Sequence, residues 1–294
     1  MTTMKAMLIE RYGKQQPLRL ADVPVPAIGE HELLAEIHAA SVNPVDFKIR
    51  DGKLKLLLHF DMPLILGNDF AGVVRAVGSK VQRFKVGDAV YGRPRKSNIG
   101  TFAQFIAAHE DDIAPKPANL SFEEAASVPL VGLTAYQALH DLMHLQAGQK
   151  ILIQAGAGGV GTFAIQLAKS MGAYVATTAG EAGAPLVQSL GADRIINYHL
   201  ENFAQVLHDY DAVLDTLGGE ALLQSVQVLK PGGMVVSVSG IPDGRFARAN
   251  GLGMFKTLLL SLASAKITRR ARQSGARRPR CRLVADDRGR TYGP

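Results

Sequence analysis

Short runs of alternating apolar and polar residues occupy the chain up to about residue 120. Ala35, Ile37 and Ala39 are separated by a glutamate and a histidine, which is the period-two pattern of a strand buried on one side. Turn-forming pairs such as Asp51-Gly52 and Gly87-Asp88 interrupt these runs. The pattern predicts an irregular, mostly antiparallel β-domain.

Strand and helix patterns alternate from Lys150 onward. Strands separated by helices imply right-handed crossovers and a parallel sheet covered by helices on both faces. The sequence therefore predicts a doubly wound α/β domain in its second half. A later apolar run, Leu258–Ala265, is too short to span a bilayer and is expected to be a buried helix. The four runs that predict strands are Ile151–Ala155, Tyr174–Ala179, Ala212–Leu214 and Met234–Val238.

A glycine-rich motif joins the first of these runs to a helical stretch. It reads Gly156-Ala157-Gly158-Gly159-Val160-Gly161. A GxGxxG sequence alone is weak evidence, but a strand before it and a helix after it are typical of a dinucleotide-binding turn. Gly156 would permit the tight turn, Gly158 would let the backbone approach a pyrophosphate, and Gly161 would let helix and strand pack closely. The free N–H groups at the helix N-terminus would bind the phosphates. We predict that all six residues bind a cofactor; a simple glycine-rich turn is the alternative.

The end of the second apolar run indicates which dinucleotide would bind. NAD-preferring sites place Asp or Glu there to bind the ribose 2′-hydroxyl. This chain has Thr178, Ala179 and Gly180 at that place, with Glu181 one residue beyond. Because none of the three carries a carboxylate that would repel a 2′-phosphate, they favour NADPH.

The positive charge of the chain is confined to its C-terminal tail. The net charge is +7, with 33 basic and 26 acidic residues. Nine arginines and two aspartates follow residue 268, and removing them leaves 24 basic and 24 acidic residues in the rest. Cys281 is the only cysteine, so the chain has neither an internal disulfide nor a thiolate metal cluster. Together with an N-terminus that lacks an apolar signal, this predicts a cytoplasmic protein with no membrane partner.

Five further segments form a specific set with the glycine motif. With them, residues 4 to about 275 resemble the zinc-free quinone oxidoreductase (ζ-crystallin-like) branch of the medium-chain dehydrogenase/reductase superfamily. The five segments are Ser41–Asp46 (SVNPVD), Leu66–Val74 (LGNDFAGVV), Gly87–Gly92 (GDAVYG), Gly132–Tyr136 (GLTAY) and Ala147–Lys150 (AGQK).

The resemblance implies a GroES-like irregular β-domain at residues 1–124 and an NADP-binding Rossmann domain with a doubly wound parallel sheet at 125–268. An Arg-rich, atypical tail occupies residues 269–294. The active site would lie between the domains. Asn43 and Asp46 would lie near the nicotinamide and the substrate as catalytic residues, although capping the turn around Pro44 is an equal alternative. Further cofactor-binding residues implied by the resemblance are Thr134, Tyr198, Asp215, Thr216, Leu217, Ser239 and Gly240.

Zinc is not expected in this chain. In zinc-dependent relatives a cysteine occupies the place of Asn43 and a His-Glu pair that of Asn68-Asp69, and a catalytic zinc needs three protein ligands. Without a metal to polarise a ketone, hydride is expected to pass to an acceptor that is already electrophilic. We therefore predict an NADPH-dependent oxidoreductase that acts on a quinone or an α,β-unsaturated carbonyl compound, with the cofactor carrying the chemistry.

The tail departs from the family near residue 275. Relatives continue with a sixth parallel strand that often makes the dimer contact. Here residues 277–282 carry arginines, a proline and a cysteine without apolar alternation, a composition that suits disorder. The sixth strand is therefore expected to be missing, as after a truncation or an altered reading frame, and with it the family's homodimer. The alternative to a reductase is a catalytically weak nucleotide-binding or RNA-binding protein, or an inactive truncated product. For the reductase, nucleic acid is expected only in nonspecific contacts of the tail.

Overall fold

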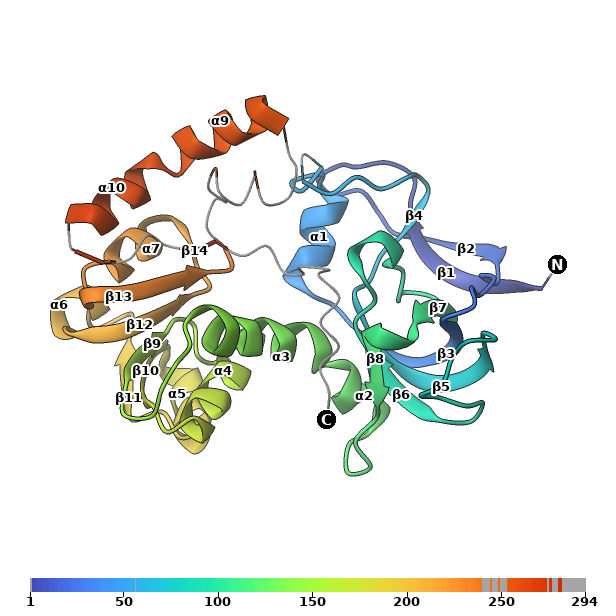
Figure 1. The fold of residues 1–294 in the computed structure, drawn as a ribbon, viewed down its shortest axis with the longest axis horizontal. Coiled ribbons are helices and arrows are strands. Elements are labelled where there is room, and N and C mark those ends of the chain that lie inside the picture. Colours follow the sequence, from blue (N-terminus) through green and yellow to red (C-terminus); the bar gives the residue numbers. More distant parts are fainter. Residues whose placement is uncertain are drawn as a thin grey trace. The chain divides into compact units, whose positions relative to one another are not determined.

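The computed structural model describes residues 2–55, 57–239, 244, 248, 253–273, 275–276 and 280–281. The chain forms two compact units that divide, in sequence, between Leu130 and Val131. Figure 1 labels the helices and strands of both units. In the described ranges no helix is long and apolar enough to cross a bilayer.

Two antiparallel sheets make up the first unit. One has the strand order β2-β1-β4 and the other the order β7-β3-β5-β6-β8. The strand predicted around residues 35–39 is part of β3, which pairs with β5 and β7. The prediction of an irregular antiparallel β-domain is confirmed. The strands are β1 (Thr3–Ile9), β2 (Arg19–Pro24), β3 (Glu32–Ser41), β4 (Leu64–Ile65), β5 (Asp69–Val77), β6 (Ala89–Gly92), β7 (Phe105–His109) and β8 (Ile113–Pro115); the helices are α1 (Pro44–Arg50), η1 (Lys96–Asn98), η2 (Glu110–Asp112) and α2 (Phe122–Ala126).

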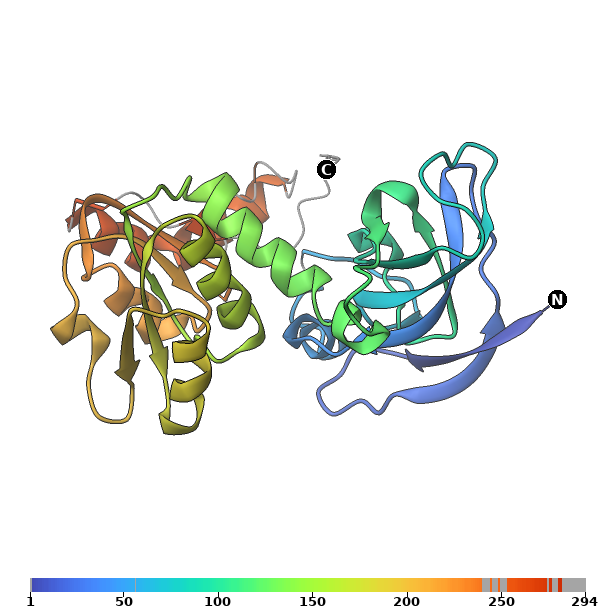
Figure 2. The same ribbon diagram turned by 90° about the horizontal axis from the view of Figure 1, so that it is seen from below.

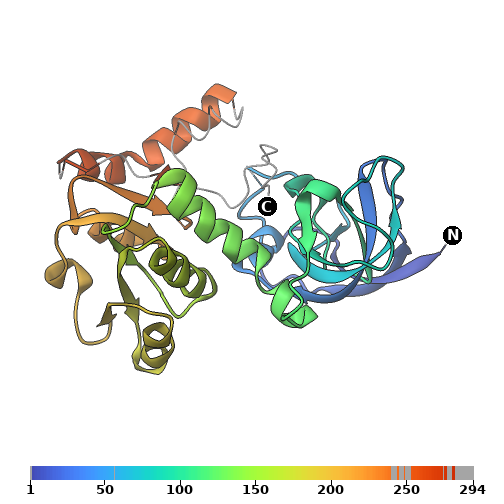
Figure 3. The same ribbon diagram turned by 60° about the horizontal axis from the view of Figure 1, so that its bottom comes forward.

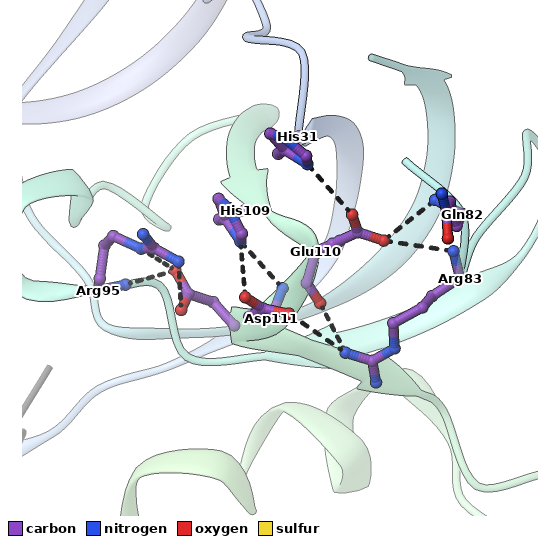
Figure 4. Close-up of polar contacts among 8 residues, drawn as sticks. His31, Gln82, Arg83, Arg95, His109, Glu110 and Asp111 are labelled. Carbon is purple, nitrogen blue, oxygen red and sulfur yellow. Dashed lines mark hydrogen bonds and ion pairs between the residues drawn. The ribbon is translucent and has the colours of Figure 1, made fainter. Parts of the chain in front are cut away.

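A buried glutamate holds η2 against a neighbouring loop of this unit (Figure 4). The Glu110 side chain is only 10% exposed. Its Oε2 accepts hydrogen bonds from the backbone N–H groups of Gln82, at 3.1 Å, and Arg83, at 3.3 Å, and its Oε1 lies 3.7 Å from His31 Nδ1. Burial alone would raise the pKa of Glu110, but the two N–H groups and His31 bring it below its ordinary value. The charged carboxylate therefore stabilises this loop.

The second unit is built on a six-stranded parallel sheet with the order β11-β10-β9-β12-β13-β14. This is the Rossmann strand order, in which successive strands are added first on one side of β9 and then, from β12 onward, on its other side. The four predicted runs correspond to β9, β10, β12 and β13, whereas the short β11 was not predicted. The strands are β9 (Lys150–Ile153), β10 (Tyr174–Ala179), β11 (Arg194–Asn197), β12 (Tyr210–Asp215), β13 (Leu229–Ser237) and β14 (Arg280–Cys281); the helices are α3 (Pro129–Tyr136), η3 (Gln137–Leu142), α4 (Gly159–Ser170), η4 (Glu181–Gly183), α5 (Ala184–Ser189), α6 (Phe203–Val206), α7 (Gly219–Ser225), α9 (Gly253–Ala263) and α10 (Ala265–Gln273).

Successive residues of the central strands contribute to two cores, one on each face of the sheet. Ile151 and Ile153 belong to the core shared with α3, α4 and α5, whereas Leu152 between them belongs to the core shared with α6, α7 and α10. Figure 2 shows the green α3 on the same side of the sheet as α4, and Figure 3 shows the orange-red α10 on the other side. Burial on both faces explains why these strands read as continuous apolar runs.

The outer edge of this sheet corrects one prediction. Arg280–Cys281 form the short strand β14, which pairs in parallel with Val236 and Ser237 of β13. A sixth strand is thus present, although the sequence predicted that it would be missing. That prediction rested on the absence of alternating apolar side chains, but strand pairing is made by backbone groups and does not need them over two residues. Residues 282–294 of the tail lie outside the described residues.

The helix predicted at Leu258–Ala265 is present, but the prediction that it is buried was wrong. The run lies on α9 and the start of α10, and the side chains of Leu258, Leu259 and Leu262 are largely exposed. A Cβ atom at Gly244 would instead overlap Ser261 Oγ, so Gly244 itself lies against the polar side of α9. The apolar run predicts the helix correctly, but not which side of it is covered.

Candidate functional site

The glycine motif forms the turn between β9 and α4, as the sequence predicted. β9 ends at Ile153, and Gly158 is the N-cap of α4. A Cβ atom at Gly161 would overlap the backbone carbonyl oxygen of Ala155, which confirms that this glycine allows helix and strand to pack closely. A Cβ atom at Gly156 would overlap Thr177 Oγ1 on β10. Gly156 is therefore required by close approach of the neighbouring strand.

The sharp bend of this turn is made by Ala155 rather than by a glycine. Ala155 has a φ of 50°, in the left-handed region that L-residues rarely adopt. Its N–H donates to Thr178 Oγ1 at 2.9 Å, and the N–H of Gly156 donates to the carbonyl oxygen of Thr178 at 2.9 Å. These two bonds fasten the bend to the end of β10. The sequence motif gave no sign of this contribution from Ala155 and Thr178.

The first turn of α4 is suited to an anionic ligand. Among the described residues no side chain caps this helix, whose N-cap is Gly158. The first N–H groups of a helix lack intrahelical partners and carry a partial positive charge. A Cβ atom at Gly158 would meet, among the described atoms, only the carbonyl oxygen of Ala155, at 3.2 Å. The arrangement fits a pyrophosphate group lying against the backbone.

The three residues predicted to select NADPH differ in their exposure. Thr178 and Ala179 are 4% and 3% exposed, so their side chains lie within the fold. Gly180 is partly exposed, and a Cβ atom there would lie 3.0 Å from Tyr198 Oη. The Tyr198 side chain is itself exposed. Of the predicted residues at this place, Gly180 and Tyr198 therefore present the surface that a ligand could contact.

Asp215, at the end of β12, orders the loop that follows it. Its Oδ1 accepts hydrogen bonds from the N–H groups of Leu217, at 3.2 Å, and Gly218, at 3.0 Å, and Ser237 Oγ donates to its Oδ2. Asp215 is fully buried, and burial raises its pKa even though these hydrogen bonds oppose the rise. These contacts position the loop after β12. The side chain of Leu217 in that loop is exposed.

The loops after β9, β12 and β13 are linked at the same edge of the sheet. Thr216 Oγ1 donates to the carbonyl oxygen of Gln154 at 3.1 Å, and Ser239 Oγ donates to the carbonyl oxygen of Thr216 at 2.7 Å. Ligands of open α/β sheets bind at this carboxyl edge, where the strand order reverses. Thr134 is buried on α3, and Gly240 lies outside the described residues.

Asn43 and Asp46, the predicted catalytic residues, lie in the first unit, at the N-terminus of α1. The N–H of Asn43 donates to Asp46 Oδ2 at 2.6 Å, and Asn68 Nδ2 donates to Asp46 Oδ1 at 2.6 Å. Both predicted residues are buried, and burial raises the pKa of Asp46 against the effect of these hydrogen bonds. The geometry is the capping arrangement that was the alternative to catalysis, and the catalytic role stays a prediction.

Asp69 is a second buried carboxylate in this region, and it was not among the predicted site residues. Its Oδ2 accepts hydrogen bonds from Ser41 Oγ, at 2.8 Å, and Asn43 Nδ2, at 2.9 Å. Its Oδ1 accepts one from the N–H of Leu130 at 2.9 Å. Burial raises its pKa to about 6, although these hydrogen bonds oppose the rise. The sequence marked it only through the segment Leu66–Val74 and through its place at the His-Glu pair of zinc-dependent relatives, and neither signal reveals its partners.

The described part of the chain holds no group of three or more His, Cys, Asp or Glu side chains placed to bind a metal ion. At the positions that zinc-dependent relatives use, Asn43 donates to Asp69, and Asn68 donates to Asp46. The absence of zinc stays a prediction from the sequence.

The fold and the glycine turn define a dinucleotide-binding α/β protein. Two family profiles match the chain: an alcohol dehydrogenase GroES-like domain at residues 29–118 and a zinc-binding dehydrogenase at residues 159–274. The chain belongs to the medium-chain dehydrogenase/reductase superfamily, as the resemblance predicted.

Similar proteins include several that are named as reductases or oxidoreductases. The chain is 41% identical over 277 residues to a 2-methylene-furan-3-one reductase of Solanum lycopersicum, covering 90% of this chain and 70% of that protein. It is 38% identical over 276 residues to a chloroplastic NADPH-dependent alkenal/one oxidoreductase of Arabidopsis thaliana, with the same coverage of 90% and 70%. Among solved structures, a quinone oxidoreductase from Coxiella burnetii matches with a TM-score of 0.80 and 36% identity, covering 97% of this chain and 84% of that one.

Proposed function

We propose that this chain is an NADPH-dependent, zinc-independent oxidoreductase that transfers a hydride to a quinone or an α,β-unsaturated carbonyl compound. The observation that carries the proposal is the turn Gly156–Gly161, which joins a parallel strand to an uncapped helix N-terminus beside the point where the strand order reverses. The relatives named as a 2-methylene-furan-3-one reductase, an NADPH-dependent alkenal/one oxidoreductase and a quinone oxidoreductase support the choice of acceptor.

NADPH would supply the hydride from its reduced nicotinamide ring. The N-terminus of α4 would hold its pyrophosphate, and Gly180 with Tyr198 would leave room for the ribose 2′-phosphate. Asp215 would keep the loop after β12 in the shape that the cofactor contacts. Asn43 and Asp46 of the first unit, which are buried and joined by a hydrogen bond, would act on the substrate as the predicted catalytic residues.

A conjugated acceptor follows from the residues that replace the zinc ligands. Asn43 and Asn68 are neutral amides, and neither supplies the charge that would polarise an isolated ketone. Conjugation in a quinone or an enone spreads the negative charge that develops when hydride arrives. The proposed enzyme therefore needs orientation and exclusion of water more than it needs an electrophilic catalyst.

The test is oxidation of NADPH by matched acceptors. We expect turnover with 3-buten-2-one and with 1,4-benzoquinone, and none with 2-butanone, which has the same carbon skeleton as the enone but no conjugated double bond. Elemental analysis of the same preparation should find well under about one zinc per chain, since Asn43 and Asn68 replace ligands and the described residues hold no group of three side chains placed to bind a metal ion. Equal turnover of the enone and the saturated ketone, or loss of activity on chelation of zinc, would overturn the proposal.

Location and partners are part of the same proposal. A single cysteine supports a reducing compartment such as the cytoplasm, although one relative is chloroplastic by its name. We infer a small-molecule substrate and no contacts with nucleic acid other than nonspecific ones of the Arg-rich tail. The loss of the family's homodimer was inferred from a missing sixth strand, and the pairing of β14 with β13 removes that reason. The domain limits 1–124, 125–268 and 269–294 also remain part of the proposal.

A further inference from the structure

Three hydrogen-bond donors from two segments far apart in the sequence meet at the carboxylate of Asp69, which begins β5 and is fully buried. Ser41 comes from the end of β3, Asn43 is the N-cap of α1, and the N–H of Leu130 belongs to the first turn of α3. A single side chain thus joins a strand and the N-termini of two helices.

The Asn43 amide has only one orientation compatible with this arrangement. Its Nδ2 donates to Asp69 Oδ2 at 2.9 Å and lies 3.0 Å from Ser41 Oγ, to which it also donates. A primary amide has two N–H donors, so both are used. Rotating the amide by half a turn would place its oxygen against the Asp69 carboxylate. Any contact of the Asn43 side chain with a ligand would therefore be made through its oxygen, as an acceptor.

We propose that Asp69 is a positioning residue for the reaction, which acts by fixing the Asn43 amide and by anchoring the first turn of α3. The inference rests on the proposed function, because Asn43 and Thr134, which α3 carries, are residues predicted for that function. Asp69 itself is not proposed to touch the substrate.

The charge of Asp69 favours positioning over simple filling of the core. A carboxylate is costly to bury, and an apolar side chain of similar size would avoid that cost. Asp69 is ionised above a pKa of about 6, where both of its oxygens accept hydrogen bonds. The benefit that the carboxylate brings is therefore the orientation of its three donors.

The test compares Asp69→Asn with Asp112→Asn. An asparagine at residue 69 has the same shape, but its N–H₂ group would face one of the three donors. We expect kcat to fall by about 10–100-fold, as misplacement of a catalytic group does. The dissociation constant for NADPH should rise by a smaller factor than kcat falls, because the glycine turn lies in the other unit and, of the predicted cofactor-binding residues, only Thr134 stands on the helix that Asp69 anchors. Asp112, which pairs with Arg95 in the same unit, should leave kcat unchanged when replaced by asparagine.

The pH profile provides a readout that a merely structural role would not affect. In the unmodified chain, protonation of Asp69 turns an acceptor into a donor, so kcat should fall as pH drops below the pKa of about 6. Asp69→Asn should lack this acidic limb. An unchanged kcat in Asp69→Asn, or an acidic limb that persists in it, would overturn the proposal.

A further measurement does not require turnover. In the ¹⁵N-labelled protein, the side-chain N–H₂ group of Asn43 should be protected from exchange with solvent, and Asp69→Asn should remove that protection while the folded spectrum is kept. Protection that is unchanged in the variant would overturn the proposal. If the unmodified chain fails to oxidise NADPH with any acceptor, the proposed function fails, and the exchange measurement still decides whether Asp69 fixes Asn43.

Discussion

Asp69 should lower the stability of this protein as pH rises, which is the opposite of the usual effect of a carboxylate. Burial raises its pKa from 3.8 to about 6, so the folded chain binds this proton more tightly than the unfolded chain does. A rise of about two units corresponds to about 3 kcal/mol at 1.36 kcal/mol per unit. The stabilising contribution of protonated Asp69 is complete below the unfolded pKa and is lost as pH rises through about 6.

Comparing the unmodified chain with Asp69→Asn isolates this contribution, because asparagine does not titrate. The substitution also changes hydrogen bonds, which shifts the free energy of unfolding by an amount that does not depend on pH. The expected result is therefore a trend: the stability of Asp69→Asn relative to the unmodified chain should rise by about 3 kcal/mol between about pH 3 and pH 7.

Urea unfolding followed by far-UV circular dichroism is the appropriate assay, since the chain contains no tryptophan. Asp193→Asn serves as a control of opposite sign. Burial alone would raise the pKa of Asp193, but Lys169 and the N–H of Val175 lower it, so the unmodified chain should gain stability over that variant as pH rises. A stability difference between Asp69→Asn and the unmodified chain that stays flat with pH would refute the reasoning.

Three further substitutions test the site and the fold. Gly156→Ala should weaken NADPH binding by at least about tenfold, because the added Cβ would displace Thr177. Gly13→Ala, whose Cβ meets only ordinary contacts, should leave NADPH binding unchanged. Isothermal titration calorimetry would measure both affinities, and equal affinities in the two variants would count against the assigned turn. Gly180→Asp should shift the preference from NADPH toward NADH by about 1–2 kcal/mol, and an unchanged ratio of the two dissociation constants would show that the 2′-phosphate lies elsewhere. Glu110→Gln should lower the free energy of unfolding by about 1–3 kcal/mol at neutral pH. That difference should vanish as pH falls through the lowered pKa of Glu110, and urea titrations that show a constant difference would contradict it.

The sequence alone determined the features that depend on residues close together in the chain. The apolar runs predicted four of the strands in the parallel sheet, because strands buried on both faces are made mostly of apolar side chains. The motif Gly156–Gly161 located the turn between β9 and α4, because its glycines are required by atoms within the same strand–turn–helix unit and the adjoining strand.

Only the tertiary structure decided which distant residues meet. Asp69 lies 61 positions from Leu130 in sequence and 28 from Ser41, and no local pattern encodes that both donate to it. The pairing of β14 with β13 was missed because backbone hydrogen bonds at a sheet edge leave no mark in the side-chain pattern. The exposed apolar side of α9 was missed for a related reason: periodicity identifies a helix and its faces, but packing against the rest of the chain decides which face is covered.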